Sequence, residues 1–149
     1  MATITITASN PQTGELILLP ANHVRAKKRE TINWRLASGC GVASIVEIEM
    51  SPSPPYPPST NIFSTPPHPN GSASKWKAVI SNFAPDYSEY NYYIKWSPEG
   101  GGDDQTFDPK ISIMPSIVFS FQRIVLLLLA IFGFCALALL FSKKKKKKG

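Results

Sequence analysis

The chain has 149 residues and a formal net charge of +6 at pH 7, but this charge is unevenly distributed. Arg123 and the six lysines Lys143 to Lys148 supply seven of the sixteen Lys and Arg residues, whereas all ten Asp and Glu residues precede them. Residues 1–114, called the head below, therefore hold nine basic and ten acidic residues, and this balance excludes a nucleic-acid-binding surface built on net positive charge.

The head begins with short segments whose patterns predict β-strands. Residues 2–8 alternate, with Ile4 and Ile6 on one face and threonines on the other, as expected of a half-buried strand. The apolar run 16–19 predicts a short strand that is buried on both faces, and Val24 starts another strand. The first part of the head is therefore expected to be β-structure.

A charged hairpin turn over residues 27–30 leads into the next predicted strand, 31–36. Trp34 shares a face with two other apolar residues of that strand, and we expect it to be the central core residue. The clearest strand pattern is at residues 46–50, where two glutamates alternate with an apolar face formed by Val46, Ile48 and Met50.

Residues 51–70 contain eight of the fourteen prolines. Proline cannot donate a hydrogen bond to a sheet, so the region 51–74 is predicted to be an extended excursion with polyproline-II character. Ile62 and Phe63 are expected to pin this excursion to the rest of the head. A PxxP ligand for a partner domain is the alternative, although such spacing arises by chance in any proline-rich segment.

Regular alternation resumes at residues 76–80 and is strongest over 90–96, where aromatic and aliphatic residues share one face. A glycine-rich turn at 100–104 precedes a closing segment over 107–114. Short strands separated by turn residues, without a segment of helical period, predict an all-β fold. We expect residues 1–114 to form an antiparallel two-sheet sandwich.

Residues 124–141 form an apolar run without a charge or a proline. As a helix this run is about 27 Å long, close to the roughly 30 Å hydrocarbon thickness of a bilayer, and it has no polar face. We therefore expect one C-terminal transmembrane helix, entered through residues 115–123 and followed by a lysine tail, 142–149. The tail is expected to contact anionic lipid headgroups through Lys143, Lys144, Lys145, Lys146, Lys147 and Lys148.

Two arguments about the orientation of this anchor conflict. The N-terminus, MATITITASN, starts no apolar signal-peptide region, which favours a cytoplasmic head and a tail-anchored protein. In that orientation the six lysines have to cross the bilayer. The positive-inside rule instead holds the lysines in the cytoplasm and places the head outside, and this orientation is slightly favoured.

Three stretches carry a resemblance to a known group of proteins. They are residues 24–34, VRAKKRETINW, residues 92–96, YYIKW, and residues 107–113, FDPKISI. Together with the alternating N-terminal strand they resemble small uncharacterised bacterial proteins, many from the Bacteroidota, with cupredoxin-like or immunoglobulin-like sandwiches. The chain departs from that pattern at Arg29-Glu30, where the group has Gly-Asp. The resemblance implies the fold and no activity, because a fold carries no chemistry by itself.

A blue-copper site requires an upstream His together with a Cys and a second His near the last hairpin. Residues 90–114 contain neither residue type, so the sequence excludes this site. His23, His68 and Cys40 remain as a chance metal-binding set, but both histidines are more simply interpreted as solvated loop residues. No metal ion or other cofactor is therefore predicted at these residues.

Acidic residues gather around the glycine-rich turn, namely Glu99, Asp103, Asp104 and Asp108. Carboxylate oxygens are ligands that calcium prefers, so a calcium-dependent binding module is an alternative. Their spacing matches no EF-hand loop, and acidic turns also occur for solubility alone.

No constellation for catalysis is visible: no serine lies in a nucleophile elbow, and no phosphate-binding glycine loop follows a strand. The sequence therefore predicts a membrane-anchored, non-catalytic β-sandwich. Its partners are expected to be the lipid bilayer and a protein or glycan that binds the loops of the head, and not nucleic acid.

Overall fold

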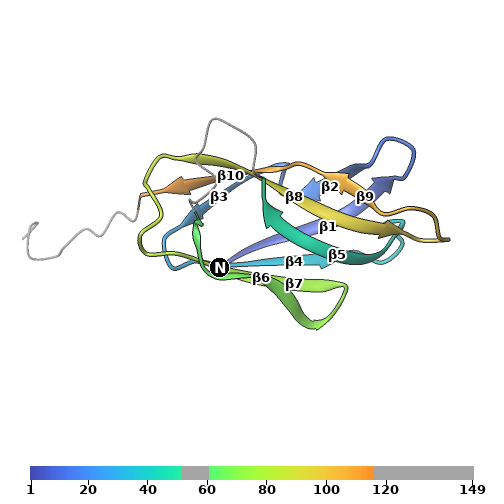
Figure 1. The fold of residues 1–149 in the computed structure, drawn as a ribbon, viewed down its shortest axis with the longest axis horizontal. Helices are drawn as coiled ribbons and strands as arrows, with labels where there is room; N and C mark the ends of the chain where they lie inside the picture. The colour runs from blue at the N-terminus through green and yellow to red at the C-terminus, as the bar shows by residue number, and fades with distance from the viewer. Residues whose placement is uncertain (52–60, 116–149) are drawn as a thin grey trace, which may run out of the picture. The chain divides into compact units, whose positions relative to one another are not determined.

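The structure is a computed structural model that describes residues 1–51 and 61–115. Every regular element in these residues is a strand, and the ten strands form two sheets (Figure 1). The prediction of an all-β, two-sheet head is therefore confirmed. The predicted transmembrane helix and lysine tail lie outside the described residues, which contain no helix that is long and apolar enough to cross a membrane.

Sheet I has the strand order β2-β1-β4-β7-β6. In it β1 pairs in parallel with β4, whereas the β1–β2, β4–β7 and β6–β7 pairs are antiparallel. Its strands are β1 (Ala2–Asn10), β2 (Glu15–Leu19), β4 (Thr31–Leu36), β6 (Phe63–Ser72) and β7 (Lys75–Ile80).

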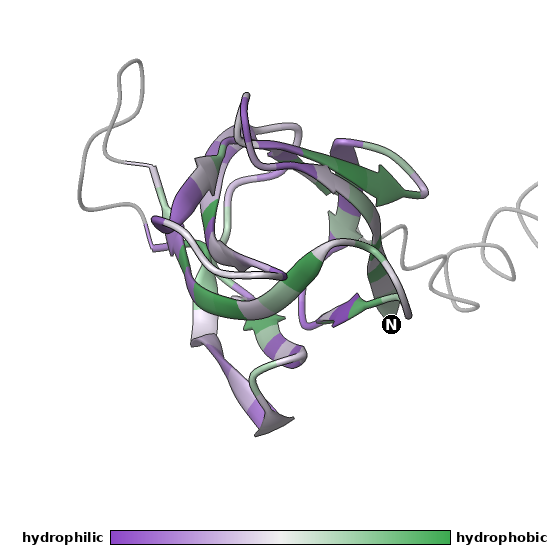
Figure 2. Ribbon diagram, turned by 90° about the vertical axis from the view of Figure 1, so that its right-hand side faces the viewer, coloured by the Kyte–Doolittle hydropathy of each residue, from purple (hydrophilic) through white to green (hydrophobic). Residues whose placement is uncertain are grey.

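Sheet II has the order β3-β10-β8-β5, and β9 also pairs with β8. Here β10 is parallel to β3, whereas the β10–β8, β5–β8 and β8–β9 pairs are antiparallel. Its strands are β3 (His23–Lys27), β5 (Val42–Met50), β8 (Glu89–Pro98), β9 (Gln105–Phe107) and β10 (Lys110–Met114). Figure 2 looks along the long axis of Figure 1 and shows both sheets curving around one interior.

The prediction of purely antiparallel sheets is wrong, because each sheet contains one parallel pair. A parallel pair cannot be closed by a tight hairpin and needs a crossover connection. The crossover between β1 and β4 runs through β3, which belongs to the opposite sheet. The predicted hairpin at residues 27–30 is therefore a turn between sheets, in which the Glu30 N–H donates to the Lys27 carbonyl at 3.1 Å.

Glu30 ties this turn to the start of the chain. Its carboxylate accepts hydrogen bonds from the Lys27 backbone N–H at 2.8 Å and from the Met1 ammonium at 2.9 Å. Burial raises the pKa of the Glu30 carboxyl, but the hydrogen bonds from Met1 and Lys27 outweigh it and leave the pKa below its ordinary value of 4.5. A carboxyl with a lowered pKa in the folded state stabilises the fold above its unfolded pKa, and this contribution is lost as the pH falls through the folded pKa.

We therefore expect Glu30→Gln to lower the free energy of unfolding by about 1–2 kcal/mol at neutral pH, since it weakens a charge-assisted hydrogen bond. The difference from wild type should shrink once the pH falls well below 4.5 and the wild-type carboxyl is protonated. Urea unfolding followed by tryptophan fluorescence at neutral and acidic pH measures both effects. Glu99→Gln, at an exposed position, is the control. If the loss of unfolding free energy did not change with pH, the effect of the substitution would come from packing and not from the charge.

The burial of β2 and β5 differs from what alternation predicts. In β2, Leu16 and Leu18 are buried, but Ile17 and Leu19 are more than half exposed, so this edge strand is buried on one face only.

In β5 the pairing with β8 shifts between Val42 and Ser44 and again between Ile45 and Glu47. These bulges change which side chains face inward. As a result Val42, Ile45 and Ile48 are buried, Met50 is half-buried and Val46 is exposed.

The proline-rich region is shorter than predicted, because residues 63–72 form strand β6. β6 is the edge strand of sheet I, where a proline that lacks an N–H interrupts only one side of the ladder. Its pairing with β7 contains three register shifts, in keeping with its prolines. Ile62 and Phe63 are buried, which confirms that they pin the end of this region to the core.

The core contains aromatic side chains from both sheets. Trp34 of β4 is 1 % exposed, and its indole Nε1–H donates to the Tyr92 hydroxyl of β8 at 3.3 Å. The two rings meet edge to face, with centroids 5.9 Å apart and an interplanar angle of 65°. On β8, Trp96 is also buried, and its Nε1–H donates to the Gly14 carbonyl at 3.3 Å. The prediction that Trp34 is a core residue is confirmed.

Candidate functional site

A groove of about 200 Å³ lies at sheet I and is lined mainly by residues of β4 and β7. The register of the central strands explains its composition, because Trp34 pairs with Trp76 and Arg35 pairs with Lys75 across the β4–β7 ladder. Alternation along β4 buries Trp34 and leaves its neighbours Asn33 and Arg35 outside the core. Charged and amide side chains of a central strand therefore border the groove.

Two buried N–H donors of the groove residues have no hydrogen-bond partner within the part of the chain that the structure describes. They are the side-chain amide nitrogen of Asn33, Nδ2, and the indole nitrogen of Trp76, Nε1. Both residues line the groove. A buried donor without an acceptor costs about 1–3 kcal/mol, which is why such groups are uncommon in folded proteins. Both nitrogens are shielded from solvent, so an acceptor oxygen of a ligand recovers part of that cost only after these side chains move.

The electrostatics of the groove favour an anionic ligand. Arg35 is oriented by a hydrogen bond from its Nε to the Thr5 Oγ1 on the neighbouring strand β1, at 2.9 Å. Lys75 lies beside it in the pairing register, and Lys77 follows on the same strand. Guanidinium and ammonium groups form their strongest hydrogen bonds with carboxylate and phosphate oxygens. The arrangement is therefore suited to binding an anionic group.

The predicted calcium residues fall at the opposite end of β8 from Glu89, in and after the glycine-rich turn. Asp104 accepts a hydrogen bond from Ser97 Oγ at 2.6 Å and lies 3.4 Å from Lys95 Nζ. The hydrogen bond from Ser97 lowers the pKa of Asp104, and Lys95 lowers it further. Glu99, Asp103 and Asp108 are exposed.

Within residues 1–51 and 61–115, no three His, Cys, Asp or Glu side chains are arranged to hold a metal ion. Calcium binding at the turn stays a prediction, and calorimetric titration with calcium tests it.

The three residues of the chance metal set lie on separate elements. His23 starts β3 in sheet II, His68 is part of β6 in sheet I, and Cys40 is buried in the connection between β4 and β5. The Nδ1 of His68 is 2.8 Å from the carbonyl of Pro66 in its own strand. The interpretation of His23 and His68 as loop residues is wrong, because both lie in strands.

The structure also brings together a Ser-His-Glu group that the sequence did not reveal. His23 Nε2 is 2.6 Å from Ser112 Oγ and 3.4 Å from Glu89 Oε2, across the adjacent strands β3, β10 and β8. In a catalytic triad the serine and the carboxylate contact different nitrogens of the imidazole, so that the carboxylate orients the base. Here both contact Nε2. The hydrogen bond from Lys110 lowers the pKa of Glu89 and holds this carboxylate, so the group forms a surface polar network.

The predicted lipid-contacting residues, Lys143 to Lys148, lie outside the described residues. Among known proteins, no family model matches the chain, and no curated protein matches it either.

Proposed function

We propose that the protein is a membrane-anchored, non-catalytic binding module. Residues 124–141 are proposed to anchor the head, with Lys143 to Lys148 against anionic headgroups on the cytoplasmic side. The length of the apolar run, its lack of a polar face and the lysines that follow it support this part of the proposal. We further propose that the head belongs with the cupredoxin-like or immunoglobulin-like sandwiches that it resembles, and its two-sheet architecture supports this assignment.

The binding function is carried by one observation, the pair of unpartnered N–H donors of Asn33 and Trp76 at the groove of sheet I. Indole N–H groups donate only, and the amide nitrogen of Asn also donates, so the ligand has to supply acceptor oxygens. Arg35 and Lys75 at the same groove add two positive charges. An acidic peptide segment of a partner protein satisfies both requirements, because its carboxylates accept hydrogen bonds and carry negative charge.

Nuclear magnetic resonance of the ¹⁵N-labelled chain in detergent micelles tests this function through the donors themselves. The probe is an acetylated triglutamate peptide. We expect saturable shifts of the Trp76 indole and Asn33 amide signals. The Trp96 indole already donates to the Gly14 carbonyl and belongs to β8 of sheet II, so it serves as the internal control whose signal should stay in place.

Charge variants check that the groove is the site of binding. Lys75→Gln should weaken binding of the triglutamate peptide about fivefold, since an exposed ion pair contributes up to about 1 kcal/mol. Lys95→Gln, which lies on sheet II, should leave the affinity unchanged. Absence of any shift at Trp76 and Asn33 would contradict the proposal. If a neutral trisaccharide caused equal shifts, the ligand of the groove would be a glycan and not an acidic peptide.

A further inference from the structure

The last described strand defines the end at which the chain leaves the head. Strand β10 ends at Met114, and in the parallel β10–β3 register Met114 pairs with Lys27, the last residue of β3. Residues 115–123 separate this point from Ile124, where the apolar run begins. A nine-residue segment spans at most about 30 Å. If residues 124–141 lie in a bilayer, the end of the head around Met114 is therefore kept close to the lipid surface.

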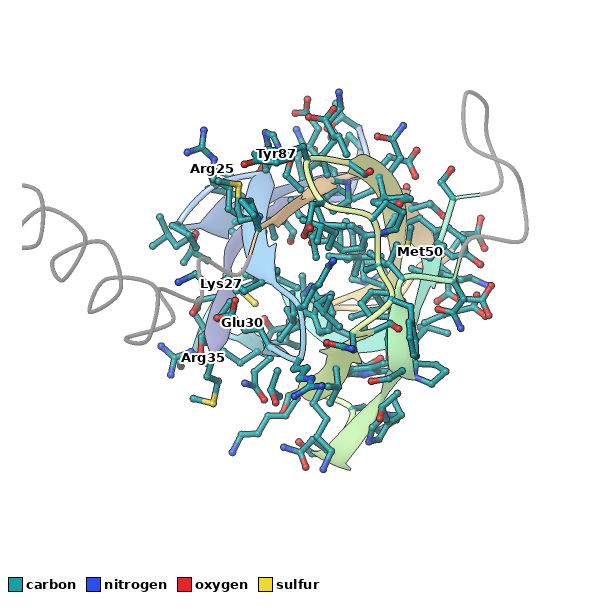
Figure 3. The ribbon with its side chains drawn as sticks, turned by 90° about the vertical axis from the view of Figure 1, so that its left-hand side faces the viewer. Arg25, Lys27, Glu30, Arg35, Met50 and Tyr87 are labelled. Carbon is teal, nitrogen blue, oxygen red and sulfur yellow. The ribbon has the colours of Figure 1, made fainter. Side chains whose placement is uncertain are left out.

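The loop between β7 and β8, residues 81–88, lies at this same end. The Arg29 guanidinium donates from Nε to the Asn82 Oδ1 at 3.0 Å, which joins the loop to the β3–β4 turn. The backbone N–H of Tyr87 donates to the Ile113 carbonyl at 2.8 Å, which joins it to the last strand. Figure 3 views this end and shows Tyr87 together with Arg25 and Lys27.

This loop exposes two aromatic side chains. Phe83 is 91 % exposed and Tyr87 is 80 % exposed, whereas Tyr90, Tyr92 and Trp96 of the following strand β8 are buried. The loop that presents them is fixed by hydrogen bonds, among them the Phe83 N–H to Ser81 Oγ at 3.1 Å. Aromatic side chains concentrate at membrane–water interfaces, where the ring reaches the headgroup region. Contact with lipid would therefore explain why this loop exposes an apolar ring to solvent.

The charge around these aromatic residues is complementary to an anionic bilayer. Lys28 is paired with Asp86 at 3.1 Å, and Glu30 is paired with the N-terminus. Arg25 and Lys27 are exposed, and in the described residues neither side chain forms an ion pair. Arg25 and Lys27 therefore add positive charge to the end that holds Phe83, although the charge of Lys27 also acts on Glu30 and lowers the pKa of that carboxyl.

We propose that this end of the head docks on the surface of the bilayer. Phe83 and Tyr87 enter the headgroup region, and Arg25 and Lys27 lie over anionic headgroups. We call this surface the proximal face. The inference rests on the proposed membrane anchor, which supplies the high local concentration that makes a weak contact effective. Docking fixes the tilt of the head.

The test places a fluorescent reporter at Phe83 in the full chain. Phe83→Cys is labelled with the polarity-sensitive dye NBD, in a background in which Cys135→Ser removes the thiol of the apolar run and Cys40, 4 % exposed, is kept. Ile17→Cys is the matched control, because Ile17 is an exposed apolar residue (59 %) on β2. The chains are reconstituted into phosphatidylcholine vesicles with or without phosphatidylserine, and spin-labelled lipids are added as quenchers.

With phosphatidylserine present, we expect a blue shift and a severalfold rise in emission at position 83, together with quenching by the spin-labelled lipid. The reporter at position 17 should resemble the dye in water. In the double variant Arg25→Ser/Lys27→Ser, the signal at position 83 should fall to the level found in pure phosphatidylcholine.

Other outcomes overturn the inference in distinguishable ways. Carbonate extraction of the same vesicles reports insertion of the anchor. A chain that is extracted overturns both the anchor and the docking. A chain that stays inserted while the dye at position 83 remains in water overturns the docking alone. A blue shift without lipid quenching identifies a protein contact, such as a second copy of the chain, and also overturns it.

Discussion

Replacing Trp34 by alanine is expected to lower the free energy of unfolding by about 3–5 kcal/mol, which is a large part of the 5–15 kcal/mol typical of a domain. The side chain is 1 % exposed and packs edge to face on Tyr92 across the two sheets. Its removal leaves a cavity between β4 and β8 and deprives the Tyr92 hydroxyl of its hydrogen-bond donor. Urea or thermal unfolding followed by circular dichroism measures the loss.

Tyr92→Phe separates the hydrogen bond from the packing. It keeps the ring but leaves the buried Trp34 N–H without an acceptor, so it should cost about 1–3 kcal/mol. Burial raises the pKa of the Tyr92 hydroxyl far above 10.0, although the hydrogen bond from Trp34 lowers it, so the hydroxyl stays neutral at physiological pH. The Trp34→Ala/Tyr92→Phe double variant should be less destabilised than the sum of the two single variants. Near-wild-type melting of Trp34→Ala would contradict the assignment of Trp34 to the core.

The alternating pattern was sufficient to predict the strands that have a regular ladder. Over residues 90–96 every second side chain is buried, as the period of two requires. The same rule failed in β5, because a bulge inserts an extra residue and moves the next side chain to the other face. Whether a bulge occurs depends on the partner strand. Local alternation therefore could not show that Ile45 is buried and Val46 exposed.

The order in which the strands pair was harder to predict from the sequence, for a similar reason. The segments on both sides of residues 27–30 have the local pattern of a hairpin, but they pair with β10 and with β1, which are remote in sequence. The proline content of residues 63–72 argued against a strand, yet β6 tolerates it because it is an edge strand. Edge position follows from the order of the whole sheet and is not encoded within the segment.

The groove could not be predicted because it depends on juxtaposition across the β4–β7 ladder. Asn33 and Trp76 each looked like ordinary strand residues, and the antiparallel register places them on neighbouring strands, one pairing position apart, where both line the groove. The Ser112–His23 contact likewise joins residues 89 positions apart. Only the residue types hinted at the groove. Asn33 and Arg35 are polar residues at the centre of a strand, and β7 alternates lysine with apolar residues.

The groove and the proximal face assign separate roles to separate surfaces of the head. The groove lies at sheet I and offers donors and positive charge to a partner. The proximal face lies at the end where β10 leaves the domain. The orientation of the anchor decides which compartment supplies the partner.

Replacing Lys143 to Lys148 by serine is expected to convert a single orientation of the chain into a mixture, without loss of membrane association. We expect the apolar run to be able to insert in either direction, whereas the charges flanking it are strongly asymmetric, with six lysines after it and Arg123 before it. Moving one positive charge against a potential of about 100 mV costs roughly 2.3 kcal/mol, so moving six costs on the order of 14 kcal/mol before desolvation. The tail should therefore hold the C-terminus in the cytoplasm and the head outside.

Protease protection of the head in sealed vesicles of known sidedness distinguishes the orientations. The wild-type head should be cleaved only from the outer side, and the serine variant should be cleaved from both sides. Replacing the six lysines by arginine is the matched control, because it keeps the charge and should preserve one orientation. An unchanged single orientation in the serine variant would mean that the targeting route, and not the tail charge, sets the topology. Cleavage of the wild-type head only from the cytoplasmic side would reject the proposed orientation and favour a tail-anchored protein, whose groove then binds a cytoplasmic partner.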